Sequence, residues 1–233
     1  MDAQAVLSLL EENKNERGIV NWNKLNPEPR KLRSYGLGLT QLRKLAKKIG
    51  KNRELALELW KSKYYDAKVI ALLIDDPKKI TLEQAEKQVE ELDGGYLAHV
   101  FSSCDATLAK TTFTQELSDR WIGSKDPVRR RCGYGLLYEN SKSKKKSAPG
   151  NAYFLNKIQQ IDQSFRDENI SVKMAMASAL MGMGLRNLEL NKAALKVADK
   201  MGPIDFDERG KCDPFDVSKH LTSERAKKKF GLI

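Results

Sequence analysis

The stretch from Arg33 to Asp76, RSYGLGLTQLRKLAKKIGKNRELALELWKSKYYDAKVIALLIDD, decides the fold class because three helical patterns follow one another within it. Apolar residues recur three or four positions apart in 39–49 and again in 55–60, which is the spacing of one face of an amphipathic helix. Residues 69–74 are all apolar and predict a nearly buried helix. This stretch therefore predicts helices joined by short turns.

Helical patterns continue through the rest of the chain, and strand signals are scarce. β-branched alternation is rare and no Asn-Gly hairpin turn occurs. Asp126 followed by Pro127 predicts the start of a helix, because proline is tolerated at the first helical position. The other helices are predicted at about 81–92, 96–103, 106–119, 152–165, 171–184, 188–201 and 215–229.

Helix pairs that recur along the chain predict the architecture. We expect an all-α protein, a HEAT-like helical-repeat solenoid (α-α superhelix) with a basic concave face, forming a single domain over 1–233. A globular helical bundle is the alternative, since the literal sequence repeat is weak. Residues 140–150 are rich in Ser and Lys and predict a flexible basic loop.

The positive charge of the chain is concentrated in two segments. The formal net charge is +11, from 42 Lys and Arg against 31 Asp and Glu. Residues 30–53 contain nine Lys or Arg and no acid, and residues 124–150 contain eight against two acids. Segregation of this kind is typical of a surface that binds phosphates, although Lys-rich helices also serve solubility. We expect a nucleic-acid partner.

Several other classes of protein are disfavoured by composition. The three cysteines form no CxxC pair, and two histidines give no zinc spacing, so we expect neither a metal site nor another cofactor. The first residues are acidic and amphipathic, unlike a signal peptide, and no apolar run approaches the roughly 18 residues of a membrane span. We expect a protein of the bacterial cytoplasm or nucleoid.

Three stretches in order along the chain carry a family resemblance. They are the segment from Arg33 through Ile74-Asp75-Asp76-Pro77, the run VRRR at 128–131, and the segment from Asp167 to Met201, which includes GLRNLELNKAALKVADKM at 184–201. Over roughly residues 30–201 the chain resembles the AlkD family of DNA alkylation-repair proteins. The resemblance implies HEAT-like repeats that wrap duplex DNA and hydrolysis of the N-glycosidic bond of purines left cationic at N7 or N3. It implies no metal or redox cofactor.

The active members of that family use Trp and Asp in a Trp-Asp-x-x-Asp turn, a later Arg and a Trp in the last repeat. This chain departs from that pattern. An ungapped alignment places Gly95 at the Trp, Tyr96 at the first Asp and His99 at the second, and the last-repeat Trp falls on Ser178. The Arg is retained among residues 129–131, which cannot all face DNA because neighbours on a helix differ by 100°.

Three residues near the altered turn are the candidate catalytic groups: Tyr96, His99 and Asp93. Tyr96 offers an aromatic face, and His99 is a candidate general base because imidazole titrates near neutral pH. An alignment slip brings Asp93, or Asp105, into the place of the carboxylate. A neutral His does not replace the charge of a carboxylate, which stabilises an oxocarbenium-like transition state.

We therefore expect a DNA-binding relative that holds duplex DNA, alkylated or distorted, through backbone phosphates, with weak or absent glycosylase activity. An active alkylpurine DNA glycosylase and a protein-binding helical scaffold are the alternatives. We expect a monomer. The candidate DNA-binding residues are Lys31, Arg33, Arg43, Lys44, Lys47, Lys48, Arg129, Arg130, Arg131, Lys144, Lys145 and Lys146.

Overall fold

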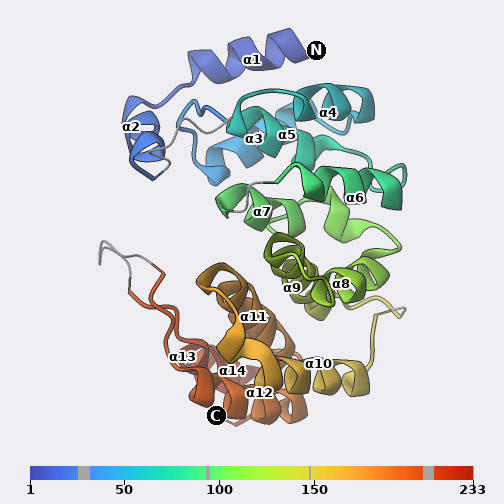
Figure 1. The fold of residues 1–233 in the computed structure, drawn as a ribbon, viewed down its shortest axis with the longest axis vertical. Helices are drawn as coiled ribbons and strands as arrows, with labels where there is room; N and C mark the ends of the chain where they lie inside the picture. Colours follow the sequence, from blue (N-terminus) through green and yellow to red (C-terminus); the bar gives the residue numbers. More distant parts are fainter. Residues whose placement is uncertain (26–31, 93–94, 147, 207–212, 233) are drawn as a thin grey trace. The chain divides into compact units, whose positions relative to one another are not determined.

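A computed structural model describes residues 1–25, 32–92, 95–146, 148–206 and 213–232. Within these ranges every regular element is a helix, and the only β-pairing consists of two isolated bridges, Arg33 to Tyr64 and Ile204 to Phe215 (Figure 1). The all-α prediction is confirmed. The chain divides into two compact units, each with its own helices, and the single-domain assignment of 1–233 stays a prediction.

The N-terminal unit comprises Met1–Glu91 and Cys104–Thr112. Its centre is α5, which packs against α1, α3, α4 and a short 3-10 helix, η1. Val69 and Ile70 of α5 are completely buried, as the apolar run predicts. The helices of this unit are α1 (Ala3–Glu12), α2 (Glu16–Leu25), α3 (Leu39–Ile49), α4 (Arg53–Trp60), α5 (Tyr65–Ile74), α6 (Leu82–Glu90) and η1 (Thr107–Lys110).

Asp66, in the first turn of α5, fixes the extended segment that leads into α3. Its buried carboxylate accepts hydrogen bonds from the backbone N–H groups of Tyr35 (2.8 Å) and Leu37 (3.0 Å) and from the hydroxyl of Ser34 (2.8 Å). Burial raises the pKa of this carboxyl group, and the three hydrogen bonds oppose that shift. The segment is therefore anchored to the core of its unit although it belongs to no helix.

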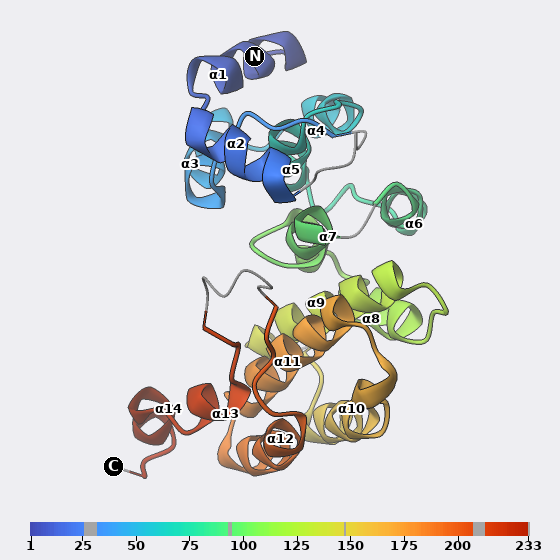
Figure 2. The same ribbon diagram turned by 60° about the vertical axis from the view of Figure 1, so that its left-hand side comes forward.

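The C-terminal unit comprises Leu92–Ser103 and Phe113–Ile233. Its centre is α9, which packs against α7, α8 and α11 (Figure 2). The helices of this unit are α7 (Gly95–Ser102), α8 (Thr114–Ile122), α9 (Pro127–Lys142), α10 (Asn151–Ser164), η2 (Phe165–Asp167), α11 (Ile170–Gly184), α12 (Leu188–Met201), α13 (Val217–Leu221) and α14 (Glu224–Lys229).

Two glycines of α9 explain how closely its neighbours approach it. A Cβ atom on Gly133 would lie 2.7 Å from the backbone nitrogen of Ile122, at the end of α8. A Cβ atom on Gly135 would lie 2.1 Å from the hydroxyl of Ser102 in α7. Both distances are shorter than real Cβ contacts allow, so glycine is required at each position for α7 and α8 to pack on α9.

Three sequence-based expectations about local structure need correction. The helix predicted at 106–119 is two elements, η1 and α8, because the Thr107 hydroxyl donates to the carbonyl of Leu72 (3.0 Å) and holds η1 on α5. The helix predicted at 215–229 is also two, because Ser223 caps a new helix by accepting from the N–H of Ala226. The loop expected at 140–150 begins only after Lys142, where α9 ends.

Candidate nucleic-acid interface

The exposed face of α3 is cationic. Lys44, Lys47 and Lys48 are exposed, whereas Leu42 and Leu45 on the opposite side of the helix are buried in the unit. The helical spacing of three and four residues places the three ammonium groups on one side. They form what we call the α3 lysine face, which no acidic side chain of α3 interrupts.

Lys51 follows the C-terminal end of α3 and is held by the neighbouring helix. Its ammonium donates to the carbonyl of Leu73 in α5 (2.8 Å). Burial and, to a smaller extent, the charge of Lys110 on η1 lower the pKa of Lys51, whereas the carboxylates of Asp75 and Asp76 oppose that shift. Lys51 is thus tied to α5 and is not part of the α3 lysine face.

Arg43 and Arg33 differ from the α3 lysine face in their surroundings. The guanidinium of Arg43 forms a salt bridge of 2.9 Å with Asp105, a residue in the left-handed region with φ of 71°. Arg33 has an exposed side chain, and its backbone pairs with Lys63 and Tyr65. Lys31 lies outside the described residues. Arg43 is thus already paired with an acid, whereas the side chain of Arg33 is exposed beside the start of α5.

The arginine triplet at the start of α9 is largely engaged within the C-terminal unit. Arg130 donates two hydrogen bonds to the carboxylate of Glu168 (2.6 and 2.8 Å) and further ones to the carbonyls of Ser124 and Lys125. Arg131 donates from Nε to the hydroxyl of Ser171 in α11 (3.0 Å). The Nε of Arg129 lies 4.0 Å from Asp126.

These contacts separate the roles of the three arginines. Arg130 is a structural tie between the start of α9 and the turn before α11, and no sequence signal identifies its partner Glu168, 38 residues away. Arg131 lies where α9 meets α11, and the next residue, Cys132, contacts the carbonyl of Ala98 in α7. Arg131 is therefore the member of the triplet that contacts α11, and its neighbour Cys132 contacts α7.

The lysines of the loop after α9 form a second basic site. Lys144, Lys145 and Lys146 are exposed. The loop starts from a fixed point, because the guanidinium of Arg186 donates to the carbonyls of Ser141 and Ser143. About twelve residues of helix separate Arg130 from the end of α9, which is roughly 18 Å at 1.5 Å per residue. The arginine triplet and the loop lysines are therefore separate sites.

Two of the three catalytic candidates, Tyr96 and His99, lie on α7. Tyr96 is exposed and its ring centroid lies 5.6 Å from that of the partly buried His99. The hydroxyl of Ser103 donates to the backbone carbonyl of His99 (2.6 Å) and lies 3.2 Å from its Nδ1. Asp93 lies outside the described residues. The sequence of α7 contains no acidic residue.

The other positions that the alignment singled out carry no catalytic side chain. Gly95 opens α7. The hydroxyl of Ser178 donates to the carbonyl of Met174 within α11 (2.9 Å), as serine commonly does inside a helix. Asp105, the alternative carboxylate, is the partner of Arg43 in the N-terminal unit. Tyr96 and His99 are thus the one pair of candidates that the described residues bring together.

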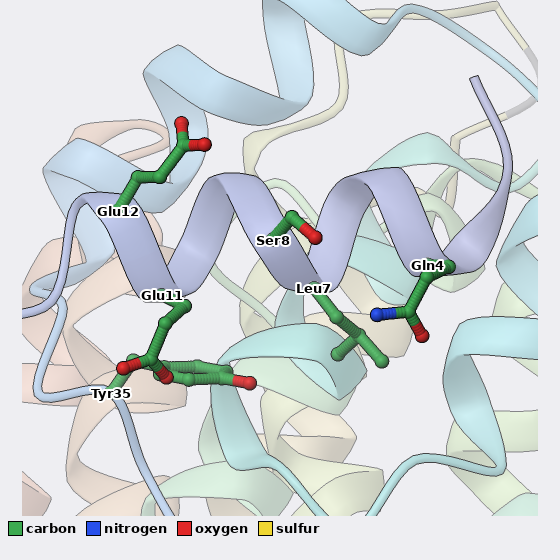
Figure 3. A pocket seen from close by; sticks show the side chains of 6 residues that line it. All are labelled: Gln4, Leu7, Ser8, Glu11, Glu12 and Tyr35. Carbon is green, nitrogen blue, oxygen red and sulfur yellow. The ribbon is translucent and has the colours of Figure 1, made fainter.

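A pocket on the N-terminal unit is unsuited to phosphate. It has a volume of about 450 Å³, and its lining includes Glu11, Glu12 and Tyr35. Figure 3 shows that Glu11 and Leu7 extend from α1 toward the side where Tyr35 lies. Two carboxylates at an open surface repel a polyanion. In the ranges that the structure describes, no group of three His, Cys, Asp or Glu side chains is placed to hold a metal ion.

Known proteins resemble this chain along most of its length. A family profile described as "DNA alkylation repair enzyme" matches residues 4–208. The chain belongs to this family. An uncharacterized protein of Listeria innocua is 24% identical over 185 residues, and one of Listeria monocytogenes is 25% identical over 185 residues, in each case covering 76% of both chains. The family resemblance predicted from sequence is confirmed.

The chain shares its architecture with another protein whose structure has been solved. Its TM-score is 0.82 at 23% identity, and the match covers 99% of this chain and 97% of the other. That protein is described as one of "a new family of proteins related to the HEAT-like repeat DNA glycosylases with affinity for branched DNA structures". The likeness establishes the HEAT-like helical-repeat fold and confirms that prediction. A basic concave face stays a prediction.

The helices of this DNA alkylation repair family member are unlike membrane spans. Among those that the structure describes, none has both the length and the apolar character needed to cross a bilayer. The predicted monomeric state, the lack of a cofactor and the cytoplasmic location stay predictions.

Proposed function

We propose that this member of the DNA alkylation repair family binds branched or distorted DNA through backbone phosphates and excises alkylated purines weakly or not at all. The α3 lysine face carries the proposal. Lys44, Lys47 and Lys48 stand on one exposed face with no acid on the same helix. Such a face neutralises phosphates and releases their counterions, which is the main source of sequence-independent affinity for DNA.

A second argument concerns the missing glycosylase chemistry. Cleavage of an N-glycosidic bond builds positive charge on the sugar, and a carboxylate next to it stabilises that charge. The candidate pair on α7 consists of Tyr96 and His99, and neither side chain carries a standing negative charge at neutral pH. The pair supports contact with a nucleotide better than it supports stabilisation of a cation.

The structural neighbour supports branched DNA as the substrate class. Affinity for branched DNA is stated for that protein, whose fold this chain shares. A branch presents phosphates in more than one direction, whereas a uniform rod of duplex DNA offers them along a single axis.

The test compares a four-way junction with a duplex of the same length and sequence composition. We expect tighter binding to the junction, with affinity for both falling steeply as salt rises. The triple variant Lys44→Ala, Lys47→Ala, Lys48→Ala should weaken binding. A matched control, Lys192→Ala, Lys196→Ala, Lys219→Ala, removes the same charge from exposed positions of α12 and α13.

Two results would contradict the proposed binding. Affinity that ignores salt would exclude phosphate contacts. Equal losses in the lysine variant and its control would show that net charge, rather than the α3 lysine face, governs binding.

An active glycosylase is the second candidate, and the exposure of Tyr96 favours it, because a solvent-facing aromatic ring is able to meet a flipped base. Single-turnover release of 7-methylguanine from a duplex separates the two candidates. Excision by the wild-type chain that falls in Tyr96→Phe or His99→Ala would establish a working site with unfamiliar residues. No excision, in samples that bind the junction, would support the binding function alone.

A further inference from the structure

We propose that the N-terminal unit carries a stacking surface for unpaired DNA bases, formed by Trp22 on α2 and Tyr64 at the start of α5. The inference rests on the proposed DNA-binding function and assigns part of it to a site away from the α3 lysine face. We call this site the aromatic surface. Its ligand is a short single-stranded segment, such as the unpaired arm of a branched DNA.

Two aromatic pairs make up the aromatic surface, and they are linked through the adjacent residues Tyr64 and Tyr65. The rings of Tyr35 and Tyr64 are stacked, with centroids 4.2 Å apart and planes inclined by 12°. The ring centroids of Trp22 and Tyr65 lie 4.7 Å apart. In each pair one ring is buried and supports the other: Tyr35 and Tyr65 are 6% and 4% exposed, whereas Trp22 and Tyr64 are only partly buried.

The backbone beneath these rings is held firmly. Arg33 donates its N–H to the carbonyl of Lys63 and accepts from the N–H of Tyr65, both at 2.8 Å. Asp66 fixes the neighbouring segment through its bonds to Ser34 and Tyr35. A partly exposed ring on a fixed backbone needs little ordering when it binds, which favours affinity.

The position of α2 is set by a backbone contact between two glycines. A Cβ atom on Gly18 would lie 2.0 Å from the carbonyl oxygen of Gly36, so no other residue fits there without displacement of α2. This contact holds α2 against the segment that Asp66 anchors, and Trp22 packs on Tyr65 of α5. The rest of the Trp22 side chain stays accessible, because no residue of α2 is fully buried.

Apolar and cationic side chains accompany the rings. Val20 and Leu25 of α2 are 52% and 50% exposed. The exposed cations of α2 and of the paired segments are Arg17, Lys24, Arg33 and Lys63.

This combination identifies the class of ligand. Proteins that bind single strands combine cations, which follow the backbone, with aromatic rings on which successive bases stack. Duplex DNA cannot use the rings, because its bases are already stacked on one another. The four exposed cations complement the phosphates of a strand, and Glu16, the one acid of α2, lies 3.6 Å from the ammonium of Lys14. This charge balance favours a nucleic-acid strand over an apolar protein partner.

Tryptophan fluorescence tests the inference directly. The chain has three tryptophans, and Trp60 and Trp121 are 5% and 1% exposed, which leaves Trp22 as the accessible one. We expect a forked duplex with an unpaired arm of ten thymidines to quench the emission, and the fully paired duplex to quench it much less. Equal quenching by the two DNAs, or none by the fork, would overturn the inference.

Variants supply an independent readout. Trp22→Leu and Tyr64→Leu keep apolar volume but remove a stacking ring, and each should lower the preference for the fork over the duplex by roughly fivefold or more. Leu57→Ser, at an exposed apolar position of α4, is the control and should leave the preference unchanged. Thermal unfolding of each variant shows whether the unit is intact. An unchanged preference in folded Trp22→Leu and Tyr64→Leu would overturn the inference.

The same titrations separate this inference from the proposed function. Salt-sensitive binding of the duplex and the fork with equal affinity would contradict the inference about the aromatic surface. It would still support the proposed DNA-binding function. If the wild-type chain bound neither DNA, both the inference and the proposed function would be contradicted. Saturable capture of an apolar peptide at Trp22, with no quenching by the fork, would assign the surface to a protein partner and contradict the proposal.

Discussion

Two basic segments that look alike in the sequence differ in the structure. The α3 lysine face is exposed along one side of a helix, whereas the arginine triplet is largely drawn into contacts inside the C-terminal unit. Side-chain chemistry favours this difference: a guanidinium forms several directed hydrogen bonds and suits half-buried contacts, whereas the more strongly hydrated ammonium groups of Lys44, Lys47 and Lys48 stay exposed. A high density of Lys and Arg in the sequence therefore does not show whether the side chains face a ligand or hold helices together.

The largest effect is expected for Arg130. Replacing it by Ala leaves the carboxylate of Glu168, whose side chain is only 10% exposed, without its partner. We expect a decrease of about 2–4 kcal/mol in the free energy of unfolding, from a buried charge left unpaired. Denaturant unfolding measures it, with Arg129→Ala as the control. A decrease below about 0.5 kcal/mol would show that the triplet is not structural.

Substitutions in the α3 lysine face should change DNA binding, whereas substitution of Arg130 should change stability. The triple variant Lys44→Ala, Lys47→Ala, Lys48→Ala should leave stability nearly unchanged but weaken DNA binding. The steepness of log K against log salt should fall by about 0.9 for each phosphate that the variant no longer neutralises. Binding titrations at several salt concentrations measure that slope. An unchanged slope would place the DNA elsewhere.

A smaller decrease in affinity is expected for the loop lysines. Lys144→Ala, Lys145→Ala, Lys146→Ala removes the same charge as the α3 variant, but from a loop, where ordering of the side chains and backbone opposes binding. The two triple variants should be compared in one salt series. A larger decrease for the loop variant would make the loop, rather than α3, the main DNA-binding element.

The smallest effect is expected at Asp105. Changing it to Asn releases Arg43 from an exposed salt bridge worth only about 0.2–1 kcal/mol, and Asn tolerates the left-handed backbone of this position. DNA affinity should rise by roughly two- to fivefold, measured by titration at low salt. Asp105→Glu keeps the charge and serves as the control. A decrease in affinity for Asp105→Asn would mean that Asp105 orients Arg43 toward DNA instead of competing for it.

Much of the helical organisation was predictable, because local patterns carry it. The apolar run at 69–74 predicts the buried part of α5, and Asp126 with Pro127 predicts the start of α9. The error at 106–119 arose where a distant contact decides, whereas the one at 215–229 was a local cap, Ser223, that the helical pattern concealed. The hydroxyl of Thr107 donates a hydrogen bond to the carbonyl of Leu72, and no sequence pattern near residue 107 predicts a break in the helix there.

The candidate site was predictable in part. The departure of Tyr96 and His99 from the family's acidic turn is visible in the order of residues alone, and the structure adds that the two side chains are neighbours on α7. The structural role of Arg130 was not visible, because its partner Glu168 is 38 residues away and carries no motif. The support of Trp22 by Tyr65 was hidden for the same reason.

The order of residues alone established the helical class, the family and the two concentrations of positive charge, because periodicity, motif order and charge are local properties of a chain. Tertiary structure decided which cations stay exposed to a ligand, which are held by Glu168 or Asp105, and which aromatic rings are supported at the surface. Those outcomes depend on distances between residues far apart in the sequence. Only the packing of the helices sets such distances, through close approaches such as those at Gly133 and Gly135.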